Sequence, residues 1–475
     1  MSTTGLHRAV DKMRSAGVPE LAIEVFGHYY AQLEQGRTGL IPEDSIEPVL
    51  DVTDISQEDV SPEQQRAALS QTVMIKLNGG LGTTMGMDRA KSLLEVREGL
   101  SFFDIIARQL VHARQTAGVA LPLLLMDSFR THDDTLAALA AYPGIAVDDL
   151  PLDFLQHQEP KLLVDTLEPV EWPADPALEW CPPGHGDIYV ALQTTGLLDE
   201  LIARGYRYAN TSNADNLGAA PDGRIAGWFA ASGARTPRSC ADGRRRTARA
   251  ATWAGGGPTG GSSCATPRRR PSRTCAGSPT RSGTRTPTPT TCGSTLSRCA
   301  LRDALAARHG IPGLPLIRNR KHVDPTDKDS PEVYQIECAL GAVVELFEDP
   351  APVLVERRSR YLPVKTTDDL LLLRSDAYDL GADHRLRLVP EKACLVTLDP
   401  HHYRRIADFE ARFPSGAPSL KGAERLDVAG DWTFGAGVVV TGDVRLADPG
   451  RPVTVPDGAD LADVATADQE EKDQS

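Results

Sequence analysis

Short apolar runs of strand length alternate with amphipathic helical patterns in the first half of the chain. Residues 121–126 form a continuous apolar run, residues 73–77 are apolar apart from Lys76, and a third run of strand character covers 206–212. Apolar residues at helical spacing fill 100–110 and 197–203. Strands that are apolar on both faces and alternate with helices are typical of a mostly parallel sheet covered by helices. The sequence therefore predicts an α/β fold, with ligands bound at the carboxyl ends of its strands.

The segments that flank this core have different patterns. Apolar residues at helical spacing, with Pro19 at a helix start, predict a helical segment over residues 1–70. Short apolar strands and recurring glycines predict a small β-solenoid domain over 390–464, followed by a polar, disordered tail over 465–475. The α/β core is then expected to cover 71–389.

The composition limits the functions that the chain can have. The eight cysteines show no zinc-ligand spacing, and no apolar run is long enough to span a bilayer. The net charge of −14 opposes binding of a nucleic-acid backbone, although a local positive pocket can still bind a small anion. No N-terminal targeting pattern is visible. We therefore expect a cytoplasmic protein with no nucleic-acid or membrane partner.

Residues 235–299 do not fit the rest of the sequence. They contain no Lys, Ile, Val, Met, Phe, Tyr, Glu, Gln, Asn or His, and they carry five of the eight cysteines. So few apolar residues cannot offset the entropy of ordering the chain, which predicts disorder. Two explanations stay open: a natural basic insertion, or a reading-frame shift that is later corrected. The Arg-, Pro- and Cys-rich composition favours the frame shift, because out-of-frame GC-rich codons give these residues.

The strongest chemical signal is the glycine-rich segment that follows the first apolar strand. Residues 77–86 read Leu-Asn-Gly-Gly-Leu-Gly-Thr-Thr-Met-Gly, and Lys91-Ser92 follow. Glycines after a strand let the backbone approach a ligand and direct N–H groups at it. The spacing is neither that of a P-loop nor that of the dinucleotide-binding fingerprint. A phosphate or nucleotide loop is the favoured interpretation, and a structural turn is the alternative.

This segment is similar to the signature of the UDP-glucose pyrophosphorylase family. Further blocks resemble that family's motifs in the family's order: 125–131, 154–156, 182–187, 212–219, 335–337 and 362–367. The resemblance covers about 70–230 and 300–450. It implies a mixed, mostly parallel nucleotidyltransferase sheet and transfer of UMP from UTP to glucose 1-phosphate, giving UDP-glucose and pyrophosphate. Mg²⁺ would be the cofactor, and a homo-oligomer through the C-terminal domain is a further implication.

The resemblance also assigns roles to matched positions. It implies nucleotide binding by loop and strand-end residues: Leu77, Asn78, Gly79, Gly80, Gly82, Thr83, Gln156 and Gly184. It implies catalysis by Lys91 and Lys365. It implies contacts to the sugar phosphate from His185, Asn216 and Gly218. Asp215 is the expected metal ligand, because a hard cation prefers carboxylate oxygen. Each residue could instead be an ordinary turn or surface residue.

Two departures from the family pattern leave alternatives open. Met87-Asp88-Arg89-Ala90 replaces the family's Cys-x-Gly-Pro before Lys91-Ser92, so the sugar preference could differ. The family's Lys-Gly-Gly and Asn-Asn-Leu-Trp blocks are absent from the stretch at 235–299. The alternatives are therefore a related UDP-N-acetylhexosamine or other UDP-sugar pyrophosphorylase, and a catalytically dead product of a frame-shifted gene.

Overall fold

The structure is a computed structural model of the chain. It describes residues 3–38, 52–147, 149–233, 236–241, 290–347 and 350–462. Among these residues, no helix is both long and apolar enough to cross a membrane.

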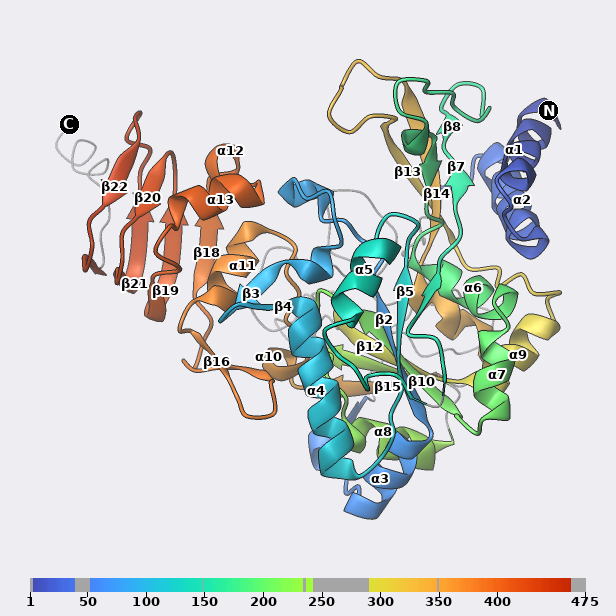
Figure 1. Ribbon diagram of the computed structural model, residues 1–475, viewed down its shortest axis with the longest axis horizontal. Helices are drawn as coiled ribbons and strands as arrows, with labels where there is room; N and C mark the ends of the chain where they lie inside the picture. Colours follow the sequence, from blue (N-terminus) through green and yellow to red (C-terminus); the bar gives the residue numbers. More distant parts are fainter. Residues whose placement is uncertain are drawn as a thin grey trace, which may run out of the picture.

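An eight-stranded sheet forms the centre of the molecule (Figure 1). Its strands, in spatial order, are β1 (Thr53–Asp54), β15 (Pro350–Val355), β11 (Thr236–Ala241), β12 (Thr290–Ser297), β10 (Tyr208–Asn213), β2 (Thr72–Leu77), β5 (Leu123–Asp127) and β6 (Asp153–Leu155). Only β12 runs antiparallel to its neighbours in this sheet, and the remaining pairs are parallel. The prediction of a mixed α/β fold with parallel strands is therefore confirmed.

Alternate residues of β2 face two separate cores. Met74 packs with the cluster that contains α4, whereas Val73 and Ile75 pack with the cluster that contains α6 and α7. A strand buried on both faces is apolar at most positions, which explains the apolar run that only Lys76 interrupts. The helices and short elements around the sheet are α3 (Pro62–Ser70), β3 (Glu95–Arg97), β4 (Leu100–Ser101), α4 (Phe102–Ala117), α5 (His132–Leu139), α6 (Ile188–Thr194), α7 (Leu197–Ala203), α8 (Gly223–Ser232), α9 (Arg298–Ala306) and α10 (Arg357–Arg360).

The ends of α4 show how local sequence fixes an element. Ser101 accepts a hydrogen bond from the backbone N–H of Asp104, and the Asp104 carboxylate accepts one from the backbone N–H of Ser101. This reciprocal capping satisfies donors that a helix leaves unpaired at its first turn. Gly118 ends the helix with a φ of 62°, a conformation that glycine adopts without strain.

Most of the described residues in the N-terminal segment are helical. Helices α1 (Thr3–Ser15) and α2 (Glu20–Glu34) lie side by side, and α1 contacts the short strand β7 (Glu159–Pro160) (Figure 1). Two more short strands, β8 (Leu162–Leu163) and β9 (Trp180–Cys181), follow β7 in the chain. The prediction of helices over 1–70 misses β1, which pairs with β15 at the edge of the central sheet. A two-residue strand has no periodicity of its own, so only its partner strand reveals it.

A second sheet supports the central one. It contains β13 (Leu316–His322), β14 (Glu332–Cys338) and β8. The end of β14 lies against the short 3-10 helix η6 (His185–Asp187), which follows the Pro-Pro-Gly segment. This contact brings two sequence blocks about 150 residues apart to one place.

The C-terminal strands lie at the opposite end of the molecule from α1 and α2 (Figure 1). Strands β18, β19, β21 and β23 form one parallel sheet, and β20 and β22 form a second parallel pair. The elements of this part are α11 (Thr367–Arg374), β16 (Tyr378–Leu380), β17 (Leu386–Leu388), β18 (Leu395–Leu398), α12 (Pro400–Tyr403), α13 (Ile406–Arg412), β19 (Ser419–Val428), β20 (Trp432–Phe434), β21 (Val439–Leu446), β22 (Val453–Val455) and β23 (Asp460–Ala462).

The prediction of disorder over 235–299 is wrong for two parts of that stretch. Residues 236–241 form β11, and residues 290–297 form β12, both inside the central sheet. Backbone hydrogen bonds to β10 and β15 hold these strands, and such bonds need little from the side chains. Residues 242–289 lie outside the described part of the chain, as does the tail expected to be disordered.

Candidate active site

Four parallel strands end in one row at the carboxyl edge of the central sheet. Residue Leu77 of β2 is level with Asn213 of β10 and with Met126 of β5. On β6, Leu155 is level with Asp127 of β5. The glycine-rich loop and the segments that begin at Ser128, Gln156 and Ala214 therefore leave the sheet beside one another, where ligands of parallel sheets bind.

The glycine-rich loop is fastened at its start by Asn78. The Asn78 amide donates to the Asp127 carboxylate at 2.7 Å and to the Thr135 hydroxyl at 2.9 Å. Asn78 is buried, so this side chain joins the ends of β2 and β5. Its predicted contact with a nucleotide would have to come from its backbone.

Asp127 is an unusual residue at this position. One carboxylate oxygen accepts hydrogen bonds from Asn78, Thr131 and Thr135, and the other is buried without a partner among the described residues. Burial raises the pKa of Asp127 from 3.8 to about 7, although its three hydrogen bonds oppose the shift.

Two glycines shape the loop for close approach. At Gly79, a Cβ atom would overlap the side-chain amide of Gln156, so the glycine lets that amide reach the loop backbone. At Gly82, φ is 67°, and the residue begins the 3-10 helix η3 (Thr83–Met85). Gln156 itself is buried, and it donates its backbone N–H to the Asp127 carbonyl at 2.8 Å. Leu77, Gly79, Gly80, Gly82, Thr83 and Gln156 thus belong to one structural unit.

Lys91, Asp215 and Lys365 form the charged centre of the site. The Asp215 carboxylate accepts from Lys91 at 2.9 Å and from Lys365 at 2.8 Å through the same oxygen, Oδ2. Lys91 also donates to the Val364 carbonyl. Burial raises the pKa of Asp215, but the ammonium groups of Lys365 and Lys91 outweigh this and hold it below its usual value. Asp215 is therefore ionised at neutral pH.

The Asp215 carboxylate keeps one oxygen for another ligand. Its Oδ1 atom is buried and has no hydrogen-bond partner among the described residues. The side chain of Lys365 is 51% exposed, compared with 12% for Lys91. Lys365 is therefore the lysine that can turn towards a bound substrate.

His185 lies in a tight loop against the end of β14. A Cβ on Gly184 would come 2.7 Å from the Cys338 carbonyl, and one on Gly186 would come 2.7 Å from the Cys338 sulfur. The His185 ring accepts at Nδ1 from the Leu340 backbone N–H at 3.1 Å. Burial, together with the nearby Lys365 charge, lowers the pKa of His185 to about 4. The ring is neutral at physiological pH, with its proton on Nε2.

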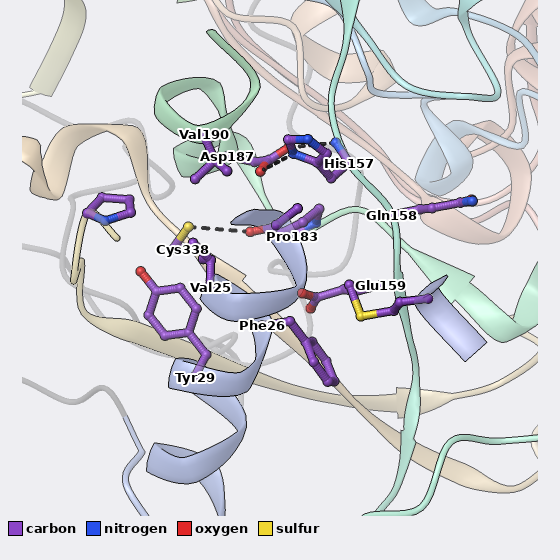
Figure 2. A pocket seen from close by; sticks show the side chains of 13 residues that line it. Val25, Phe26, Tyr29, His157, Gln158, Glu159, Pro183, Asp187, Val190 and Cys338 are labelled. Carbon is purple, nitrogen blue, oxygen red and sulfur yellow. Dashed lines mark hydrogen bonds and ion pairs between the residues drawn. The ribbon is translucent and has the colours of Figure 1, made fainter. Parts of the chain in front are cut away.

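A small hollow lies behind this loop (Figure 2). Phe26 and Tyr29 of α2 line one side, and Cys338, Glu159 and Asp187 line the other. Its free space is about 10 Å³, which leaves room for one water molecule and none for a nucleotide. The hollow therefore marks where the N-terminal helices support the His185 loop.

Asn216 and Gly218 contact the segment around Arg360 and Leu362. The Asn216 amide donates to the Arg360 carbonyl at 3.3 Å, and its oxygen accepts from the Leu362 N–H at 2.8 Å. A Cβ on Gly218 would come 2.5 Å from the Arg360 carbonyl carbon. These two residues dock the loop after β10 onto the segment that carries Lys365. Their role as sugar-phosphate contacts stays a prediction.

Sequence reasoning missed several residues of this region. Lys76 is buried in β2 and donates to Ser212 and to the Ala219 carbonyl. Arg360 is buried and donates to the Ala220 carbonyl at 2.6 Å. For Lys76 there was a signal, because a lysine inside a continuously apolar strand needs a buried partner.

These elements together define an α/β protein whose glycine-rich loop and Lys91–Asp215–Lys365 cluster lie at the carboxyl edge of its parallel strands. Comparisons with known proteins then assign the family. The model of the UTP–glucose-1-phosphate uridylyltransferase family matches residues 23–247 and 299–441, and the chain belongs to this family.

Relatives match over nearly their whole length. A UTP–glucose-1-phosphate uridylyltransferase from Hordeum vulgare is 32% identical over 479 residues, covering 96% of this chain and 95% of the relative. The enzyme from Solanum tuberosum is 33% identical over 423 residues, covering 84% of this chain and 82% of the relative. Among solved structures, a point mutant of UDP-glucose pyrophosphorylase from Leishmania major in complex with UDP-glucose has a TM-score of 0.84 at 35% identity. That comparison covers 98% of this chain and 99% of the other.

Proposed function

We propose that this chain transfers UMP from UTP to glucose 1-phosphate and releases pyrophosphate. The observation that carries the proposal is the ionised Asp215 held between Lys91 and Lys365 beside the glycine-rich loop. Family membership supplies the reaction type, and the arrangement of these groups suits two polyanionic substrates.

The reaction is a displacement at the α-phosphorus of UTP. A phosphate oxygen of glucose 1-phosphate forms the new P–O bond while the bond between the α-phosphorus and the α,β-bridging oxygen breaks. Pyrophosphate leaves with that electron pair. The nucleophile is already an anion, so the protein needs no strong general base. Its task is to align the substrates and to offset their charge.

The two lysines are suited to that task. Lys91 donates to Asp215 and to the Val364 carbonyl, so its ammonium group is fixed near the loop. Lys365 is half exposed and can exchange its bond to Asp215 for one to the α-phosphate. The neutral His185 ring would add an N–H donor to a sugar-phosphate oxygen without adding charge.

The nucleotide would lie along the glycine-rich loop, with backbone N–H groups directed at its phosphates. Gln156 lies against Gly79, where its amide would read the edge of the uracil. Gly184 would complete the uracil contacts through its backbone. Asn216 and Gly218 would hold the sugar-phosphate side of the site in register.

Asp215 fits Mg²⁺ as a cofactor. Its buried Oδ1 atom has no partner in the described part of the chain, and a hard cation prefers such an oxygen. No group of three or more His, Cys, Asp or Glu side chains placed to hold a metal occurs among the described residues. Mg²⁺ commonly binds one or two carboxylates together with substrate phosphates, so the Asp215 carboxylate would suffice on the side of the protein. When bound, the ion would neutralise phosphate charge.

The direct test is pyrophosphate release by the purified chain with UTP, Mg²⁺ and glucose 1-phosphate. Release that depends on all three components would support the proposal. A panel containing N-acetylhexosamine 1-phosphates distinguishes the related UDP-sugar pyrophosphorylases. A preference for another sugar would correct the substrate and leave the reaction type intact.

A second candidate is a chain that binds the nucleotide without turnover. The break in the family match between residues 247 and 299 favours it, because it coincides with the anomalous stretch. Saturable UTP binding without pyrophosphate release would support this candidate. Recovery of activity after restoration of the reading frame would then identify the stretch as the cause.

We also propose that the described part of the predicted domain 390–464 forms a β-solenoid and mediates a homo-oligomer in the cytoplasm. The parallel order of β18, β19, β21 and β23 supports the solenoid, and the 39% exposure of Val439 on β21 supports an apolar contact. Light scattering of the purified chain tests the assembly. An oligomer that Val439→Glu converts to a monomer would support it, and a monomeric unsubstituted chain would contradict it.

A further inference from the structure

The loop that follows β10 has its backbone carbonyls held by side chains from four different parts of the chain. These carbonyl-holding side chains, here called the carbonyl cradle, pair as follows: Gln109 with Leu217, Lys76 with Ala219, Arg360 with Ala220, and Arg385 with Pro221. Loop carbonyls usually bind water at the protein surface. Here a stretch of five residues directly after Asp215 and Asn216 is instead fixed by the protein.

Lys76 closes the loop at both ends. Its ammonium group donates to the Ser212 hydroxyl at 2.9 Å and to the Ala219 carbonyl at 2.8 Å. Ser212 lies in β10 before the loop, and Ala219 lies after Asp215 and Asn216. One buried side chain therefore spans the segment that carries the candidate metal ligand.

Arg360 joins the same loop to the segment that carries Lys365. Its guanidinium donates to the Ala220 carbonyl, while its own backbone carbonyl accepts from Asn216. The Val364 N–H donates to the Asp215 carbonyl at 3.2 Å. Displacement of the loop would therefore change the distance between Asp215 and Lys365.

The charge in the cradle is costly for the fold. Lys76 and Arg360 are both buried, and Arg385 is partly buried. Two carboxylates lie near these cations: that of Asp222 is 3.8 Å from the Arg360 guanidinium, and that of Asp383 is 3.7 Å from the Arg385 guanidinium. Burial, together with the Arg360 charge, lowers the pKa of Lys76 to about 7. Neutral side chains could satisfy the same carbonyls at lower cost, so stability alone does not explain these cations.

We propose that Lys76 is a positioning residue for the transfer reaction. By spanning the loop after β10, it holds the Asp215 carboxylate at bonding distance from Lys91 and Lys365. Its effect on turnover rests on the proposed function, whereas its effect on the loop is a property of the fold and is measurable without turnover.

The experiment compares Lys76→Met with Lys161→Met in the full chain. Methionine keeps the length and the apolar stem of lysine but removes the donor. Lys161 is a matched control, because it is also buried and donates to a single backbone carbonyl, that of Val323, at 2.9 Å outside the cradle. The readouts are kcat, the KM for UTP, the melting temperature, and hydrogen–deuterium exchange of residues 213–222.

Lys76→Met is expected to lower kcat about 100-fold, because a displacement of about 1 Å in the reacting groups has an effect of this size. The KM for UTP should stay close to that of the unsubstituted chain, and exchange in residues 213–222 should increase. Lys161→Met should lower the melting temperature without changing kcat or this exchange. Equal kcat losses in the two variants, or unchanged exchange in Lys76→Met, would overturn the proposal.

Two further outcomes stay informative. If Lys76→Met does not fold, Arg385→Gln replaces it, because Arg385 is more exposed and holds only the end of the loop. Unchanged exchange of residues 213–222 in that variant would overturn the proposal that the carbonyl cradle holds this loop. If the unsubstituted chain releases no pyrophosphate, the proposed function fails, while increased exchange in Lys76→Met alone still supports the positioning role.

Discussion

Two buried cations in this protein have opposite surroundings. Lys76 donates to Ser212 and to the Ala219 carbonyl, at 2.9 and 2.8 Å. Arg298, at the start of α9, is 0% exposed, and none of its three guanidinium nitrogens has a hydrogen-bond partner among the described residues. The guanidinium lies over the Tyr206 ring, whose centre is 5.7 Å away.

The two cations differ in whether their buried donors have hydrogen-bond acceptors. A buried cation is tolerated when its donors are satisfied, as at Lys76, and it is strongly unfavourable when they are not. Arg298 belongs to the stretch 235–299 whose composition suggests a frame shift. The fold supplies a position for an apolar residue there, and the sequence supplies arginine. This supports the frame-shift hypothesis, which sequencing of the coding DNA tests directly.

The largest effect is expected in the loop region that Lys76 holds, where the candidate active site lies. Replacing Lys365 by Ala should lower kcat about 1000-fold, since loss of one preorganised cationic donor has an effect of this order. Lys365 is half exposed, so the melting temperature should hardly change. Steady-state pyrophosphate release and calorimetry measure the two quantities. A near-normal kcat would remove Lys365 from the site.

The next effect tests the close docking of the loop. Gly218→Ala would place a Cβ atom 2.5 Å from the Arg360 carbonyl carbon and push the Lys365 segment away. We expect kcat to fall about 100-fold. Gly27→Ala is the matched control, because nothing lies within 4 Å of its Cβ position in α2. Equal activity of the two variants would show that the docking is not needed for turnover.

At the start of α9, where the Arg298 side chain is buried, Arg298→Leu should stabilise the protein. Removal of an unpaired buried charge is expected to raise the free energy of unfolding by about 2 kcal/mol. Burial lowers the pKa of Arg298 to about 9, so above that pH only the unfolded state stays fully protonated. The gain should therefore be full below pH 9 and shrink above it. Urea unfolding at several pH values measures it, and a loss of stability would mean that Arg298 has a partner.

Asp127→Asn should have the smallest effect. The folded protein keeps the Asp127 proton up to about pH 7, whereas the unfolded chain loses it near 3.8. The free energy of unfolding of the unsubstituted protein should therefore decrease as the pH rises from 3.8 to about 7. In the variant this decrease should be absent. At pH 8 the variant should be more stable by about 1 kcal/mol. A pH-independent difference between the two proteins would contradict the buried carboxylate as its cause.

Much of the fold and the site was predictable from local sequence. The segments 73–77 and 121–126 became β2 and β5, because strands buried on both faces are apolar at most positions. Lys91, Asp215 and Lys365 were singled out from three separate motifs, and the structure brings them together. The two-residue strand β1 was missed, since its only signal is its partner.

The sequence alone determined the alternation of strands and helices, the glycines that open the loop, and the residue types that can meet phosphate. These follow from local rules: apolar periodicity, backbone freedom, and charge. Only the tertiary structure decided that Lys76 and Arg360 hold the loop of Asp215, and that the buried Arg298 guanidinium has no hydrogen-bond partner among the described residues. Satisfaction of a buried polar group depends on atoms that are distant in sequence, and only the folded chain sets those distances.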